Sequence, residues 1–265
     1  MDLGLEGRSC VVTGASRGIG LATARSLCGE GARVLLCSRG AEELEEAVRE
    51  CAAAGGEADG LVLDVTAPDA GERLVSTCAE RFGPVEIAVA NAGTSVARAL
   101  EELTDADWQA QWELHVIAPL RLMRAAAPVM AERGEGRIVN VCSSSGKRPS
   151  LTNAAYSVTK AAQLSLSRVF ADTYAERGVL VNAVTPGPVE TPLWMAEGGL
   201  ADQVAERQGI TRDEALTTAR EKIPRGRFGT EEEIAAVIVF LCSARAANVA
   251  GAAWSVDGGA VPIIL

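Results

Sequence analysis

Residues 13–20 read Thr13-Gly14-Ala15-Ser16-Arg17-Gly18-Ile19-Gly20 and join an apolar, strand-like segment to a helix-like one. The glycines permit a tight turn, and the first N–H groups of the following helix have no partner within it. Such a helix start can bind a pyrophosphate, although an ordinary glycine-rich turn is the alternative because the spacing is not G-x-G-x-x-G. From its position we predict a dinucleotide-binding loop with contacts from Gly14, Ser16, Arg17, Gly18, Ile19 and Gly20.

The rest of the chain alternates buried-strand patterns with amphipathic helical ones. This rhythm predicts an α/β fold: a single doubly wound Rossmann-like domain over residues 1–265, with a seven-stranded parallel sheet and helices on both faces. Residues 186–227 are too long for a simple crossover, so we expect a substrate lid there. The expected strands are Ser9-Thr13, Arg33-Cys37, Leu61-Asp64, Val85-Ala90, Arg137-Cys142, Leu180-Val184 and Ala252-Val256.

The composition of the chain disfavours several classes of partner and of metal site. The chain has 35 acidic and 25 basic residues and a formal charge of −10, which disfavours nucleic acid and anionic membranes as partners. No basic segment followed by an apolar run opens the chain, and no apolar stretch approaches a membrane span, so we expect a cytoplasmic protein. Seven cysteines without a C-x-x-C pair are expected to be reduced core thiols rather than metal ligands or disulfides, and a single histidine predicts no metal site.

Cofactor preference depends on the end of the second strand. A dinucleotide fold usually presents a carboxylate there, but this chain has Ser38 and Arg39. Arg39 and Arg17 can pair with a 2′-phosphate, so we predict NADP(H), with NAD(H) possible; two solvated arginines are the alternative. Asp64, before Val65, is either an adenine contact or a helix N-cap. Small residues at Asn91-Ala92-Gly93 let the backbone approach the cofactor, and the Asn91 amide can tie strands together.

Catalytic residues are predicted from one helix and one strand end. Tyr156 and Lys160 stand four residues apart, hence on one helical face, where the ammonium can favour the phenolate. Ser143 follows the fifth predicted strand, at the edge where open α/β sheets bind ligands, and can hydrogen-bond a substrate carbonyl. Ser144 and Ser145 have the same chemistry but should point elsewhere.

Together these motifs, with Asn182-Ala183-Val184-Thr185-Pro186-Gly187 and Val256-Asp257-Gly258-Gly259, resemble the short-chain dehydrogenase/reductase family, and the tail is similar to that of 3-oxoacyl-carrier-protein reductases. The resemblance implies hydride transfer between a nicotinamide and a carbonyl or alcohol. Tyr156 would be the general acid or base, Ser143 would polarise the carbonyl, and Lys160 would bind ribose and lower the pKa of Tyr156. It also implies nicotinamide contacts from Pro186, Gly187, Val189 and Thr191.

Three further predictions concern His115, the substrate wall and the oligomeric state. His115 stands where the family usually has an asparagine in a proton relay, and we favour a relay histidine that titrates in mild acid over a structural one. Leu193, Trp194 and Met195 predict an apolar substrate wall, although an exposed or oligomer-buried tryptophan is equally compatible. Family resemblance predicts a homotetramer, with Ile234, Val237, Ile238, Phe240, Leu241 and the apolar tail 260–265 as candidate contacts.

Two other functions are alternatives to an oxidoreductase. A non-catalytic dinucleotide-sensing regulator would be expected to lack Tyr156 or Lys160, and both are present. A sugar-nucleotide epimerase or dehydratase would be expected to have a longer chain and a T-G-x-x-G-x-x-G loop. The preferred hypothesis is an NADP(H)-dependent carbonyl reductase or alcohol dehydrogenase.

Overall fold

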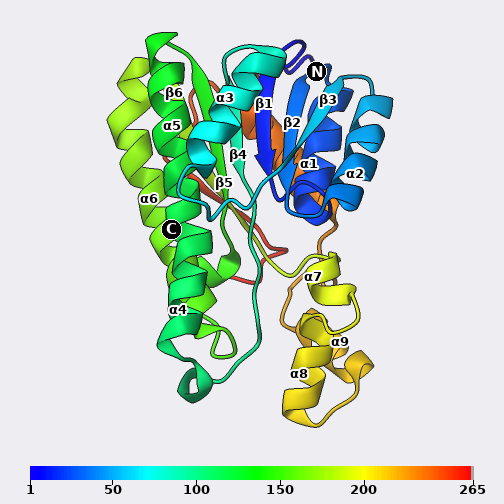
Figure 1. Ribbon diagram of the computed structural model, residues 1–265. Helices are drawn as coiled ribbons and strands as arrows, with labels where there is room; N and C mark the ends of the chain where they lie inside the picture. Colours follow the sequence, from blue (N-terminus) through cyan, green and yellow to red (C-terminus); the bar gives the residue numbers. More distant parts are fainter. Residues whose placement is uncertain (264–265) are drawn as a thin grey trace.

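A computed structural model describes residues 1–263, and within them seven strands form one parallel sheet in the order β3-β2-β1-β4-β5-β6-β7. The order reverses between β1 and β4, which places a ligand crevice at the carboxyl ends of these strands. This arrangement confirms the predicted fold class (Figure 1). The strands are β1 (Ser9–Thr13), β2 (Arg33–Ser38), β3 (Glu57–Val62), β4 (Ile87–Ala90), β5 (Gly136–Val141), β6 (Val179–Pro186) and β7 (Ala253–Val256).

The third strand is the one whose prediction was wrong by several residues. It covers Glu57–Val62 rather than Leu61–Asp64, because β3 is an edge strand whose pairing with β2 does not require an apolar sequence. Its side chains are partly or fully exposed, so hydrophobicity gave no signal for it. Asp64 consequently lies beyond the strand and does not end it.

Helices cover both faces of the sheet, each over its own apolar core (Figure 1). One core includes Leu27, Leu36 and Ile238, and the other includes Leu74, Leu122 and Ile138. The first face carries α1 (Gly18–Gly29), α2 (Ala41–Ala53) and α10 (Glu231–Cys242); the second carries α3 (Ala70–Phe82), α5 (Ala118–Glu132) and α6 (Ala154–Tyr174).

Helix α10 shows why three of its five predicted subunit contacts are wrong. It begins after Thr230, whose hydroxyl accepts the Glu233 N–H in a capping box. Its apolar residues Ile234, Ile238 and Leu241 are fully buried against this subunit's own sheet. Val237 and Phe240 are only partly buried and stay available for another subunit, while Ile264 and Leu265 of the predicted apolar tail lie outside the described residues.

A continuous helical run, Asp105–Glu132, joins α4 (Asp105–Trp112) to α5 through a π-helical turn at Glu113–Ile117. By length and composition alone this run could cross a membrane, which we did not predict. Half of its apolar window is buried inside the protein, and α5 packs on the sheet, so its hydropathy is that of a core helix.

Beyond the strand ends lie the short helices of the predicted lid (Figure 1). They form a small core of their own, in which Trp194 packs edge-on against the buried Phe228 with 5.1 Å between ring centroids. Met195 packs in the same cluster. Both residues are only partly buried, so the expected apolar substrate wall stays a prediction for them. The helices are α7 (Pro192–Met195), α8 (Leu200–Gln208) and α9 (Arg212–Glu221). That residues 1–265 form a single domain and that residues 186–227 form the lid both stay predictions.

The remaining helices are single 3₁₀ turns. They cover Leu100–Glu102, Ser144–Gly146, Ala175–Arg177 and Ala244–Ala246. The second of them directly follows Ser143 and thus shapes the edge of the site.

Candidate active site

The glycine loop is folded as a cradle at the start of α1. Gly14 and Gly18 have φ angles of +63° and +64°, which side-chain-bearing residues rarely adopt. A Cβ on Gly20 would lie 2.2 Å from the Gly14 carbonyl oxygen. Arg17, the N-cap of α1, makes no side-chain capping hydrogen bond, so the helix start is open to an anion. These features fit a pyrophosphate.

Thr13 and Asn91 fasten this cradle to the neighbouring strand β4. The Asn91 amide donates to the carbonyls of Thr13 at 2.9 Å and Gly14 at 3.0 Å, as the predicted strand tie requires. The Thr13 hydroxyl accepts the N–H groups of Asn91 at 3.0 Å and Ala92 at 3.1 Å. Four hydrogen bonds thus hold the loop to the segment that follows β4 before any ligand binds.

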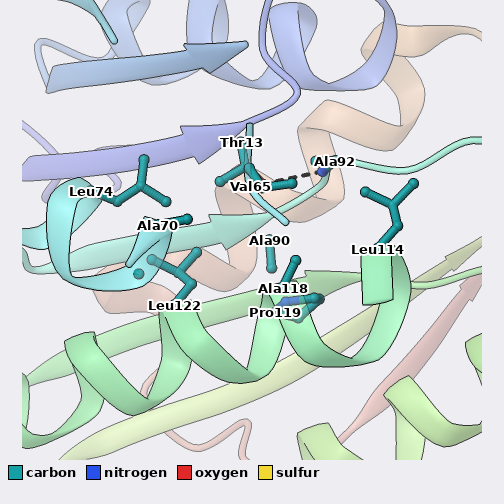
Figure 2. A pocket seen from close by; sticks show the side chains of 11 residues that line it. Thr13, Val65, Ala70, Leu74, Ala90, Ala92, Leu114, Ala118, Pro119 and Leu122 are labelled. Carbon is teal, nitrogen blue, oxygen red and sulfur yellow. Dashed lines mark hydrogen bonds between the residues drawn. The ribbon is translucent and has the colours of Figure 1, made fainter. Parts of the chain in front are cut away.

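A small apolar cavity lies below this tie, between the sheet and helices α3 and α5 (Figure 2). Its lining includes Val65 and Ala92, two predicted cofactor contacts, and the hydrogen bond from Ala92 to Thr13 crosses its upper edge. Most other lining residues are apolar core side chains such as Leu74 and Leu122. The cavity therefore belongs to the packing beneath the cofactor edge and not to the catalytic centre.

Arg17 and Arg39 are both exposed, at the ends of elements that meet beside the glycine loop. Asp64 accepts the Thr66 backbone N–H at 2.9 Å and the Thr66 hydroxyl at 2.7 Å. These hydrogen bonds lower the pKa of Asp64, and Arg39 lowers it further. Asp64 therefore closes a local turn; the N-cap of α3 is Asp69, so the helix N-cap alternative is wrong.

The structure brings Ser143, Tyr156 and Lys160 together at the carboxyl end of β5. Of the three candidate serines, Ser143 is the one whose hydroxyl lowers the pKa of Tyr156. Burial has the larger, opposite effect and raises the pKa of Tyr156 to about 12. Burial thus outweighs any effect of Lys160, whose Nζ lies 5.6 Å from the ring centroid, and the lowering of the phenol pKa by Lys160 stays a prediction.

Two neutral oxygens anchor the Lys160 ammonium. Its Nζ donates to the Val141 carbonyl and to Gln163 Oε1, both at 2.9 Å. Burial lowers the pKa of Lys160 to about 8, so most of the amine is charged at neutral pH. An ammonium has three donors, hence one is left for the open side of the site.

His115 braces the site from the π-helical turn. Its Nε2 accepts the Thr94 backbone N–H at 3.3 Å, so the proton sits on Nδ1, which faces the Thr159 hydroxyl at 3.2 Å. The imidazole stands edge-on to the Tyr156 ring with 5.1 Å between centroids. Burial and the nearby Lys160 hold the pKa of His115 well below 6.5. The expected titration in mild acid is therefore wrong, and both ring nitrogens are committed to structural contacts.

The predicted nicotinamide contacts lie where β6 leaves the sheet. A Cβ on Gly187 would lie 2.9 Å from Asp257 Cα, so glycine allows this segment to pass close to β7. Thr191 lies over the glycine loop, its methyl 3.8 Å from the position of a Cβ on Gly18. Val189 is buried and bridges to Gly229. Pro186 ends β6, so the segment lines the same edge as the cradle.

Sequence reasoning missed Thr13 and Gln163. Thr13 was included in the loop motif, but no contact or structural role was predicted for its side chain. Gln163 stands three residues after Lys160, a spacing that places both on one helical face. Gln203 of the lid, whose Oε1 accepts the Ala97 N–H at 2.9 Å, had no sequence signal.

Comparisons with known proteins show which family this chain belongs to. The family model described as enoyl-(acyl carrier protein) reductase matches residues 14–261. A putative ketoacyl reductase of Streptomyces coelicolor is 37% identical over 251 residues, 94% of this chain and 95% of the relative. A cis-4-hydroxycyclohexanecarboxylate dehydrogenase of Sinomonas cyclohexanicum is 38% identical over 255 residues, 95% and 96% of the two chains.

Among solved structures, L-sorbose reductase from Gluconobacter frateurii, complexed with NADPH and L-sorbose, has a TM-score of 0.92 to this protein. The two are 35% identical, and the match covers 100% of both chains. The chain belongs to the short-chain dehydrogenase/reductase family, which confirms the resemblance and the predicted oxidoreductase class.

Proposed function

We propose that this protein is an NADP(H)-dependent oxidoreductase that interconverts a carbonyl compound and a secondary alcohol. The observation that carries the proposal is the meeting of Ser143, Tyr156 and Lys160 at the strand ends that also hold the glycine cradle. NADPH, when bound, supplies the hydride that reduces the carbonyl carbon. The NADPH-bound L-sorbose reductase and the carbonyl or alcohol substrates named for the relatives support this assignment.

In reduction, Tyr156 donates a proton to the oxygen that becomes the alcohol hydroxyl. Its pKa of about 12 keeps the phenol protonated at neutral pH, as a general acid requires. Ser143, whose hydroxyl lowers the pKa of this phenol, polarises the same carbonyl oxygen. The Lys160 ammonium uses its remaining donor for the cofactor ribose, and its charge stabilises the phenolate left after the transfer.

Cofactor binding is assigned to the cradle and the ends of the strands. The N–H groups at the start of α1 face the pyrophosphate, and Arg17 and Arg39 carry the preference for a 2′-phosphate. Ser38 replaces the usual carboxylate, so nothing at that position repels the phosphate. Asp64 and Val65 border the adenine side.

The substrate class stays broad in this proposal. Of the three residues expected to form an apolar wall, Leu193 is exposed, whereas Trp194 and Met195 are partly buried against the lid core. These side chains would favour a substrate with an apolar portion. Activity with NADPH across 3-oxoacyl thioesters, cyclic ketones, keto sugars and steroids would identify the class.

Removing the phenol hydroxyl tests the chemistry. Tyr156→Phe keeps the ring and should lower kcat by about 10²–10⁴-fold while NADPH affinity changes little. Single-turnover NADPH oxidation and cofactor fluorescence measure the two effects. Retention of more than about a tenth of the activity would refute general-acid catalysis by Tyr156.

Assembly and location are also part of the proposal. Phe240 packs against Trp254, a residue 37% exposed on the edge strand β7, which supports a homotetramer with contacts there. Light scattering that reports a monomer at micromolar concentration would overturn it. The seven cysteines are free and buried, which supports a reducing, cytoplasmic setting.

A further inference from the structure

The Lys160 ammonium is a buried charge whose hydrogen-bond partners are neutral. Lys160 is 3% exposed and Gln163 is 1% exposed. An ammonium removed from water is costly unless hydrogen bonds replace those of the lost solvent. The fixed acceptors are the Val141 carbonyl and Gln163 Oε1, so removal of the glutamine oxygen would leave the backbone acceptor alone.

We propose that Gln163 is a positioning residue for Lys160: its side-chain oxygen holds the ammonium at the Tyr156 side of the site and stabilises its charge. The assignment deepens the proposed function and rests on it for the role of Lys160. Gln163 lies one helical turn after Lys160 on α6, so a rigid backbone sets the distance between the two side chains. Val141 approaches from β5, and the two acceptors together fix the direction of the third donor.

The other titratable groups that face Lys160 do not stabilise its positive charge. Tyr156 precedes it on α6, Cys142 follows β5, and His115 faces it from the π-helical turn. Burial keeps the pKa of Cys142 near 12, and His115 is neutral, so neither supplies a counter-charge at neutral pH. Within residues 1–263 no carboxylate forms an ion pair with Lys160, so the ammonium depends on dipoles.

The test reads the charge of Lys160 directly, in the protein without cofactor. The chain has three lysines, Lys147, Lys160 and Lys222, so lysine labelled with ¹³C at Cε gives three signals, and Lys160→Arg assigns one of them. Gln163→Met keeps the side-chain length and removes the oxygen. It should lower the apparent pKa of Lys160 by about one unit, because a hydrogen bond to a charged group is lost.

Gln163→Glu should shift the apparent pKa of Lys160 in the opposite direction. It keeps the proposal testable if Gln163→Met fails to fold. A carboxylate at this position should raise the apparent pKa of Lys160 by about one to three units. The signals of Lys147 and Lys222 should stay unchanged in both variants. Gln109→Leu, an exposed change on α4, is the control for loss of a glutamine and should move none of the three signals.

The alkaline limb of kcat/KM for carbonyl reduction should move in the same directions, down with Met and up with Glu. A Lys160 signal that titrates identically in wild type, Gln163→Met and Gln163→Glu would overturn the assignment, whatever the activity. Opposite pKa shifts without any NADPH oxidation would support Gln163 as the anchor and refute the proposed function instead. The two hypotheses therefore fail separately.

Discussion

Replacing Gly20 with alanine tests the cradle at its tightest point. The new Cβ would lie 2.2 Å from the Gly14 carbonyl oxygen and 2.4 Å from Asn91 Nδ2, two atoms that are hydrogen-bonded to each other at 3.0 Å. Neither can retreat easily, because one is backbone and the other is held by Thr13 as well. The methyl group must therefore push the loop away from β4.

Overpacking of this kind costs about 1–3 kcal/mol of unfolding free energy. For a chain of this size that corresponds to a fall in Tm of about 2–10 °C. We expect the Kd for NADPH to rise by about tenfold or more, since a loss of about 1.4 kcal/mol in cradle geometry is enough for that. Differential scanning fluorimetry and NADPH fluorescence titration measure the two quantities.

Gly29, in the same helix, provides the matched control. A Cβ there would meet nothing closer than the Ala54 carbonyl oxygen at 3.9 Å. Gly29→Ala should therefore stabilise the protein by about 0.5–1 kcal/mol through lower backbone entropy in the unfolded chain and leave NADPH affinity unchanged. If Gly20→Ala kept the wild-type Tm and bound NADPH within twofold of wild type, the reasoning on the cradle would be wrong.

Two further outcomes follow from charge and burial. Arg39→Asp should reduce the ratio of kcat/KM for NADPH over NADH by about 10–100-fold, the worth of one charge-assisted hydrogen bond, whereas Arg49→Asp on the exposed face of α2 should leave the ratio unchanged; equal ratios in both variants would exclude Arg39 from 2′-phosphate recognition. Because the folded-state pKa of His115 is depressed, its contribution to stability is present above about pH 6.5 and is lost as pH falls below it, by up to about 1.4 kcal/mol per pH unit. Urea unfolding at pH 7.5 and 5 should show His115→Asn losing less stability than wild type, and parallel losses would contradict a buried neutral imidazole.

Local features of this protein could be predicted from the sequence. Tyr156 and Lys160 share a helical face because a spacing of four residues imposes it, whatever surrounds the helix. The glycine loop follows from its place between a buried strand and a helix, and β1 has the predicted bounds. Strand β3 escaped prediction because an edge strand carries no continuous apolar signal.

Properties that depend on contacts between distant segments were decided only by the tertiary structure. Trp194 turned inward because Phe228, far along the chain, completes the lid core. The tautomer and low pKa of His115 follow from Thr94, Thr159 and burial, none of which its own sequence neighbourhood reveals. The same holds for Tyr156, whose pKa reflects burial more than its helical neighbour. Sequence fixes spacing along one element, whereas desolvation is set by whatever other elements pack over it.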